Sequence, residues 1–360
     1  MGLDITGRYR YPPPDTAWLA ADREEVLAPE LPIIDPHHHL WVEDGQPYLL
    51  DQLLDDTTSG HAIKATVFVQ AHFGYRTDGP PHLASVGETE QVMLIRAAAR
   101  ARTGAPDIAA AIVAQADLML GDAVDEVIAA HIEVAGNRLR GIRHSVSRDE
   151  HFPDGIVLRP APAQLLADPA YRAGLRRVAQ HGLSYDAMLY HQQIPELTAM
   201  ARALPELPIV LDHLGCVLGV GHYAGREQEN LRNWAADIAQ LAECPNVSVK
   251  IGGFGMIVTG ARWHERDRPP SSTELALAWR PYVETCIDLF GPARCMFESN
   301  FPVDKAMYSY RTLWNAFKRL AADCSDDDRR WLFHDTAAQF YRIPARSAGS
   351  VDDRLGAVSA

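Results

Sequence analysis

The stretch I-K-A-T-V-F-V-Q (63–70), a helical pattern over 87–102 and the stretch I-A-A-A-I-V-A (108–114) together decide the fold. Both apolar runs are short and continuous, which is typical of strands that are buried on both faces. The apolar residues of the segment between them are spaced as in a helix. A buried strand, a helix and a second buried strand in this order predict a parallel βαβ unit.

Six further apolar runs repeat this unit along the chain, at 31–35, 139–143, 183–187, 209–212, 247–251 and 295–298. Helical spacing follows or separates them, over 122–134, 169–180, 195–204, 228–243, 274–289, 310–320 and 326–341. Eight repeats predict an α/β fold, a single-domain (β/α)8 TIM barrel over 31–342, with an N-terminal extension over 1–30 and a C-terminal tail over 343–360. An open doubly wound sheet is the alternative, but no G-x-G-x-x-G turn follows an early strand.

The 360-residue chain has 47% hydrophobic and 22% charged residues, the usage of a globular protein rather than of a disordered one. Lysine and arginine number 34 and acidic residues 47, and the net charge of −13 disfavours nucleic acid and anionic membranes as partners. No apolar run approaches the roughly 20 residues that cross a bilayer, and the five dispersed cysteines form no C-x-x-C pair. We therefore expect a cytoplasmic protein with reduced thiols that acts on a small molecule, as a monomer or a homo-oligomer.

Polar side chains follow nearly every apolar run. Because the carboxyl ends of all strands in a parallel barrel face the same side, we expect these side chains to meet at one rim. Beyond the three histidines that end the first run, the candidates are Gln70 and His72 after the second run, Arg143 and His144 at the fourth, Tyr190 and His191 after the fifth, His213 after the sixth, Lys250 in the seventh, and Asn300 and Asp304 after the eighth.

The histidines are the sharpest feature of this predicted rim. His37 and His39 are two residues apart on the first strand, so both side chains point to one side and His38 points away. Their imidazoles can approach one metal ion or one substrate oxygen together, although an HHH run can also be a surface loop or part of a packed core. His213 follows a nearly all-apolar run, where an imidazole can be a metal ligand, a proton carrier, a hydrogen-bond donor or a core histidine.

Two cations lie at the same predicted rim. Arg143 and Lys250 can hold a substrate carboxylate or stabilise an oxyanion, and a structural salt bridge, for example to Asp186, explains either residue equally well. Further substrate contacts are expected from Gln70, His72, His144, Tyr190 and His191, with core packing as the alternative for the tyrosine.

Seven segments carry these residues in a fixed order: IIDPHHHLW (33–41), SVGETE (85–90), LRGIRHS (139–145), LSYDAMLYHQQIPEL (183–197), VLDHLG (210–215), VKIGGFGM (249–256) and CMFESNFPVDK (295–305). They resemble the amidohydrolase superfamily, in particular the amidohydrolase-related group that contains sugar-lactone, muconolactone-type and pyrone-dicarboxylate lactonases. The resemblance implies a barrel hydrolase in which His37, His39 and His213 bind one divalent ion such as zinc or manganese, or polarise a carbonyl directly, since some members of the group work without tightly bound metal.

The chain departs from that group in the eighth strand. Where the family pattern is G-S-D-W-P, with an aspartate that acts as metal ligand or general base, this chain has E-S-N-F-P (298–302). The Asn300 amide does not titrate and cannot take a proton from water. Asp304 and Glu298 are the two carboxylates that can replace this base, and capping of the following helix is the alternative role for Asp304.

We therefore expect an enzyme that opens a lactone of a small carboxylate-bearing or sugar-acid metabolite with an activated water molecule. A metal-dependent decarboxylase, or another non-hydrolytic barrel enzyme acting on an aromatic or carboxylic acid, is one alternative, because Arg143 and Lys250 can hold a carboxylate. A catalytically silent barrel that binds a small molecule is the other.

Overall fold

A computed structural model describes residues 12–21, 24–43, 46–152 and 160–344 of the chain. Eight strands pair in parallel to form one sheet in the order β1-β4-β5-β6-β7-β8-β9-β10. Their bounds are β1 Pro32–His38, β4 Ala62–Val69, β5 Asp107–Ala114, β6 Leu139–Ile142, β7 Ser184–Ala187, β8 Ile209–Leu211, β9 Val247–Ile251 and β10 Cys295–Phe297. All eight predicted strands are confirmed, because each continuous apolar run is buried between the barrel interior and the helices.

The first strand extends further than its apolar run, through His38. The segment after β10 explains this extension, because it pairs with the end of β1 and closes the barrel. Asn300 donates its backbone N–H to His37 O (2.9 Å), and His39 donates to Phe301 O (2.8 Å). The predicted TIM barrel is confirmed, and its closing seam carries both the H-x-H and the E-S-N-F-P segments.

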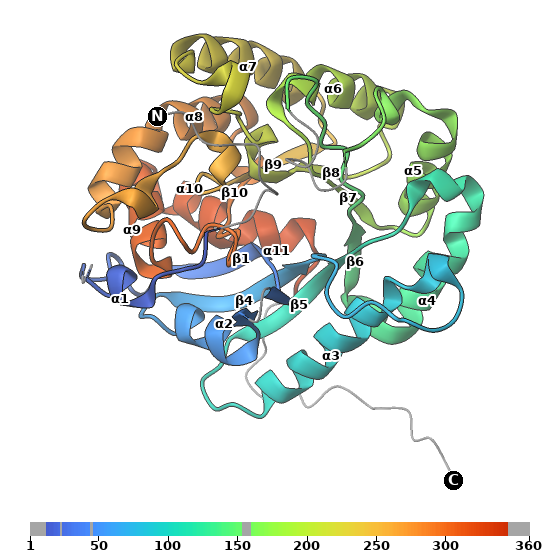
Figure 1. Ribbon diagram of the computed structural model, residues 1–360, viewed down its shortest axis with the longest axis horizontal. Coiled ribbons are helices and arrows are strands. Elements are labelled where there is room, and N and C mark those ends of the chain that lie inside the picture. Colours follow the sequence, from blue (N-terminus) through green and yellow to red (C-terminus); the bar gives the residue numbers. More distant parts are fainter. Residues whose placement is uncertain (1–11, 22–23, 44–45, 153–159, 345–360) are drawn as a thin grey trace.

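Helices form a ring around the strands (Figure 1). They are α1 Thr16–Leu19, α2 Leu50–Thr57, α3 Val86–Arg100, α4 Val124–Ala135, α5 Pro169–Gln180, α6 Ile194–Ala203, α7 Glu227–Ala242, α8 Ser272–Phe290, α9 Tyr310–Leu320, α10 Asp326–Arg330 and α11 Thr336–Phe340. The predicted helix over 326–341 is divided, because a π-helical segment, Trp331–Asp335, separates α10 from α11. The apolar pattern of the sequence did not predict α1, α2 or the short hairpin of β2 (Trp41–Glu43) and β3 (Gln46–Tyr48).

The described part of the N-terminal extension packs against α9. Lys318 donates to the carbonyl oxygens of Leu27 (2.8 Å) and Ala28 (2.9 Å), and Asn315 Oδ1 accepts from Leu27 N–H (2.9 Å). Residues 345–360 of the predicted C-terminal tail lie outside the described residues. None of the described helices is long and apolar enough to cross a membrane.

Candidate active site

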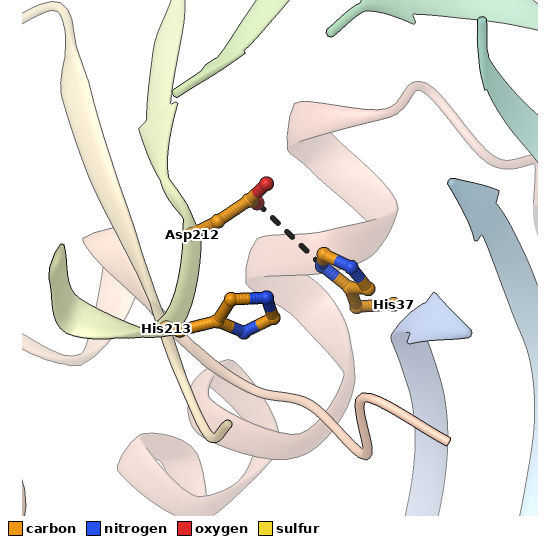
Figure 2. Close-up of side chains that lie close together, drawn as sticks. All are labelled: His37, Asp212 and His213. Atoms are coloured by element: carbon orange, nitrogen blue, oxygen red, sulfur yellow. Dashed lines mark ion pairs between the residues drawn. The ribbon is translucent and has the colours of Figure 1, made fainter. Parts of the chain in front are cut away.

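The ends of two strands bring His37, Asp212 and His213 together (Figure 2). His37 lies near the end of β1, and the other two residues directly follow β8. The His37 and His213 ring centroids are 4.5 Å apart, and His37 Nδ1 lies 3.5 Å from Asp212 Oδ1. All three residues are buried, and one ligand atom of each lies within 4.8 Å of the other two, so the group could hold a metal ion.

A tight turn allows the adjacent Asp212 and His213 both to reach this cluster. The backbone is left-handed at His213 (φ 54°) and Leu214 (φ 44°), which is uncommon for residues other than glycine and concentrates at functional sites. Gly253, after β9, packs against the imidazole of His213. A Cβ at this position would lie 2.6 Å from His213 Cγ, so only glycine fits there without displacement.

Glu298 holds His213 in place. Glu298 Oε1 lies 2.6 Å from His213 Nδ1 and accepts the His213 backbone N–H at 3.1 Å, while Glu298 Oε2 lies 2.9 Å from His37 Nδ1. Burial lowers the pKa of His213, but the neighbouring Glu298 carboxylate more than offsets this and raises that pKa above its usual value. Because Nδ1 faces the carboxylate, Nε2 is the nitrogen of His213 that is left to exchange a proton with a substrate or water.

Lys250 lies at the centre of the cluster and is fully buried. Its Nζ donates to Asp186 Oδ2 (2.7 Å) and to His37 Nδ1 (3.1 Å), and forms an ion pair with Asp212 Oδ1 (3.0 Å). Burial lowers the pKa of Lys250, but the carboxylates of Asp186 and Asp212 more than offset this and raise it above its usual value. The ammonium therefore makes two hydrogen bonds and an ion pair inside the cluster, as expected if Lys250 forms a structural salt bridge.

His39 and Arg143 complete the cluster on the opposite side of His37. His39 Nε2 lies 3.2 Å from His37 Nε2, and His39 Nδ1 donates to Val69 O (2.8 Å). Arg143 NH1 lies 3.3 Å from His37 Nε2 and NH2 donates to the carbonyl oxygen of Gln70. Burial first, and then the nearby cations, lower the pKa of both His37 and His39, so these imidazoles are neutral near pH 7.

Asn300 and Asp304 form a second pair beside the seam. Asn300 Nδ2 donates to Asp304 Oδ1 (2.9 Å), while Asn300 Oδ1 is buried with no hydrogen-bond partner among the described residues. Asp304 Oδ2 accepts from Gly255 N–H (2.8 Å) and Tyr308 OH (2.5 Å). Burial raises the pKa of Asp304 to about 6. Asp304 does not cap α9, whose N-cap is Ser309.

Several predicted substrate contacts lie away from this cluster. His144 Nδ1 accepts the backbone N–H of Leu118 (3.0 Å), and His191 Nδ1 accepts that of Leu218 (3.2 Å). Tyr190 is buried in a small apolar group with Cys216, Leu218, Met256, Val258 and Val303. His72 is exposed on the loop after β4 and pairs with Tyr75 OH (2.8 Å). His38 contacts Thr66 Oγ1 (2.9 Å), which agrees with its predicted orientation away from His37 and His39.

The carboxylates of the cluster were predicted only in part. Asp212, directly before His213, was given no role from the sequence, whereas Glu298, the first residue of E-S-N-F-P, was one of the two acids considered as the replacement base. A third acid, Asp35, supports the site from below: it accepts from Ser299 N–H (3.0 Å) and Tyr310 OH (2.9 Å). The signal for all three was the same, an acidic residue at or beside a strand end.

A cavity of about 360 Å³ opens beside His213. Its walls include Gly253 and the aromatic side chains of Phe254, Trp263, Trp279 and Tyr282. This volume falls within the range of roughly 300–1,000 Å³ that is usual for small-molecule sites. Among the described residues of the cluster, His213 is the one that lines the cavity, so a ligand there would meet this imidazole first.

The ligand types suit a divalent ion, but the charges around them do not. Two imidazoles and a carboxylate are the usual ligands of zinc, and such an ion lowers the pKa of bound water and stabilises an oxyanion. However, the Lys250 ammonium lies 3.1 Å from His37 Nδ1 and 3.0 Å from Asp212 Oδ1. As arranged, two of the three ligands are already engaged by a positive charge.

Comparison with known proteins identifies the family. A family model described as amidohydrolase matches residues 34–343. The chain belongs to the amidohydrolase family. A relative, protein y4mH of Sinorhizobium fredii, is 33% identical over 340 residues, which cover 87% of this chain and 99% of the relative. The L-fucono-1,5-lactonase of Burkholderia ambifaria is 27% identical over 86% of this chain and 95% of its own length. The predicted resemblance is confirmed, and the protein is an amidohydrolase-family hydrolase.

Solved structures agree with the fold. An amidohydrolase from Burkholderia multivorans, crystallised with bound zinc, has a TM-score of 0.66 at 23% identity over 87% of this chain and 99% of its own. A structure described as a 2-pyrone-4,6-dicarboxylic acid hydrolase from Pseudomonas putida has a TM-score of 0.57 at 19% identity over 88% and 99%. At these identities the likeness establishes the barrel fold alone.

Proposed function

We propose that this hydrolase opens a lactone of a small sugar acid or carboxylate-bearing metabolite by attack of water on the ester carbonyl. Relatives named L-fucono-1,5-lactonase, from two Burkholderia species, support this substrate class at 27% and 26% identity. The observation that carries the proposal is the contact of 2.6 Å between His213 Nδ1 and Glu298 Oε1 in a fully buried pair beside an open cavity.

In this proposal His213 is the general base. Glu298 fixes the imidazole so that Nδ1 faces the carboxylate and Nε2 takes the proton of the attacking water. The imidazolium that forms is stabilised by the buried carboxylate, just as a third group orients and stabilises the histidine of a hydrolytic triad. The same imidazolium then returns the proton to the ring oxygen that leaves as the lactone opens.

Asn300 and Asp304 position the water in this scheme. The free Asn300 Oδ1 accepts a hydrogen bond from the water, and Asp304 fixes the amide orientation through its contact with Nδ2. Asp304 is therefore a positioning residue, since three donors occupy its carboxylate. The role of base passes from the eighth-strand position to His213.

Arg143 and His39 face the developing negative charge in this scheme. The guanidinium is 7% exposed and contacts the Gln70 carbonyl, so it is fixed at the mouth of the cluster. A fixed cation in a site that excludes water stabilises an oxyanion strongly and needs no rearrangement. His144, Tyr190, His191 and His72 take no direct part in the proposed reaction, because their contacts hold them elsewhere.

Proton release from lactones tests the proposal. L-fucono-1,5-lactone is the first probe, followed by other 1,4- and 1,5-lactones of sugar acids. We expect the wild-type protein to hydrolyse at least one of them, and His213→Gln to lose at least about 100-fold in kcat. His181→Gln is the matched control, because this histidine pairs with Asp125 far from the cluster. No hydrolysis of any lactone, or an active His213→Gln protein, would contradict the proposal.

A further inference from the structure

The ammonium of Lys250 lies near the barrel axis. Lys250 lies on β9, and its partners come from strands on different sides of the barrel: His37 from β1 and Asp186 from β7. In the sheet order, β1 and β7 are separated by three strands in one direction around the barrel. Tyr341 closes the site from below, since its hydroxyl donates to Asp186 Oδ2 (2.6 Å) and its ring centroid lies 5.4 Å from Lys250 Nζ.

This position coincides with the one available to a metal ion. His37 and Asp212 belong to the group whose ligand atoms gather within 4.8 Å, and both contact the ammonium. An ion that bound His37 Nδ1 and Asp212 Oδ1 at the usual distance of about 2 Å would lie against Lys250 Nζ, which is 3.1 Å and 3.0 Å from these two atoms. Two positive charges at that distance in a buried site repel each other strongly, because little solvent screens them.

We propose that the Lys250 ammonium is the resident cation of this site, so that it and a divalent ion exclude each other from His37 and Asp212. The proposal concerns cation binding and needs no assumption about the substrate. Under this proposal Lys250 is a positioning residue. Its ammonium supplies to the histidine cluster the fixed positive charge that a bound metal ion supplies in a metal site.

Positive charges face both ring nitrogens of His37. Lys250 Nζ lies 3.1 Å from His37 Nδ1, and Arg143 NH1 lies 3.3 Å from His37 Nε2. A further cation at this imidazole would therefore meet two fixed positive charges. Glu298 Oε2, 2.9 Å from His37 Nδ1, has no hydrogen-bond partner among the described residues.

Zinc binding to chelator-stripped protein tests the exclusion. We would measure zinc uptake by equilibrium dialysis with elemental analysis, for wild type, Lys250→Met and Lys318→Met. Lys318 is the matched control, since it is a buried lysine that contacts Leu27 and Ala28 outside the cluster. We expect Lys250→Met to gain one zinc site per chain that binds at least about 100-fold tighter than wild type. Adding His213→Gln to Lys250→Met should remove that site.

A second, charge-balanced variant controls for misfolding of Lys250→Met. Lys250→Met leaves two buried carboxylates without their cation, so Lys250→Met with Asp186→Asn removes one charge of each sign and keeps the local balance. It should gain the same zinc site. Nitrogen-15 NMR of labelled histidines gives an independent readout: the His37 and His213 ring resonances should shift when zinc is added to the double variant and should stay unchanged in wild type.

Unchanged zinc affinity in the folded variants would overturn the proposal. Stoichiometric zinc in the wild type that is lost on Lys250→Met substitution would also overturn it. Neither result depends on lactone hydrolysis, so failure of this inference is distinguishable from failure of the proposed function.

Discussion

Replacement of Glu298 by glutamine tests the proposed base most sharply, because it removes a charge and keeps the shape. Glu298 is fully buried, and its Oε1 lies 2.6 Å from His213 Nδ1. A hydrogen bond to a charged group contributes about 1.5–3 kcal/mol, and a buried pair at this distance lies at the upper end of that range. If this stabilisation is realised as the imidazolium forms, its loss of about 3 kcal/mol lowers kcat by roughly 100-fold.

The pH profile provides a second prediction for the same variant. Glu298 raises the pKa of His213 above its usual value, whereas burial alone lowers it. The base works when it is deprotonated, so the acid limb of the wild-type rate profile lies above the ordinary histidine range. In Glu298→Gln this limb should move to lower pH, while the plateau of the rate falls.

The assay is proton release from the best lactone substrate between pH 5 and 9, with thermal unfolding to confirm the fold. Glu284→Gln is the control, since Glu284 pairs with Arg280 on the exposed face of α8 (2.7 Å) and should leave both the rate and the profile unchanged. A kcat for Glu298→Gln within about threefold of wild type, with an unmoved acid limb, would refute the role of this pair.

Three further substitutions test the neighbouring contacts. Asp304→Asn should lower kcat by about 10-fold and remove a rate limb near pH 6, because burial raises the pKa of Asp304 to about 6 and its ionised form orients Asn300; an unchanged profile would separate Asp304 from the water site. Gly253→Ala should lower both kcat and stability, the latter by about 2 kcal/mol in urea unfolding, since its φ is +68° and its Cβ would lie 2.6 Å from His213 Cγ; wild-type values would show that the loop yields freely. Burial raises the pKa of Glu88 from 4.5 to about 7, so the folded state binds the proton more tightly than the unfolded state and the free energy of unfolding falls as the pH rises from about 4.5 to 7. Glu88→Gln should reduce this fall in the free energy of unfolding by about 2.5 kcal/mol between pH 5 and 8, and equal slopes in the two proteins would place the pKa of Glu88 at its ordinary value.

The barrel could be predicted because each of its strands is a continuous apolar run, and continuous runs need covering on both faces. The same reasoning placed the polar strand ends at one rim. Arg143 and His144 both follow β6, and only the arginine reaches the cluster, because His144 Nδ1 accepts the backbone N–H of Leu118. Tyr190 and His191 lie on a 3-10 turn beyond β7, where strand geometry no longer applies.

The chemistry at the centre of the site was harder to predict. Asp212 and His213 are also neighbours, yet both face the site, because a left-handed turn after β8 replaces strand geometry there. The depth of Lys250 depends on how the strands are staggered around the barrel, which no local pattern encodes. From the sequence we predicted this lysine at the rim of the barrel, whereas in the structure it lies near the barrel axis, where it contacts Asp186.

A crystal structure of His213→Gln with an intact lactone is the sharpest test of water activation by His213. We expect the ester carbonyl at the barrel mouth between Arg143 and residue 213, with a water molecule on Asn300 Oδ1. A lactone bound elsewhere, with no water in hydrogen-bond contact with Asn300, would contradict it.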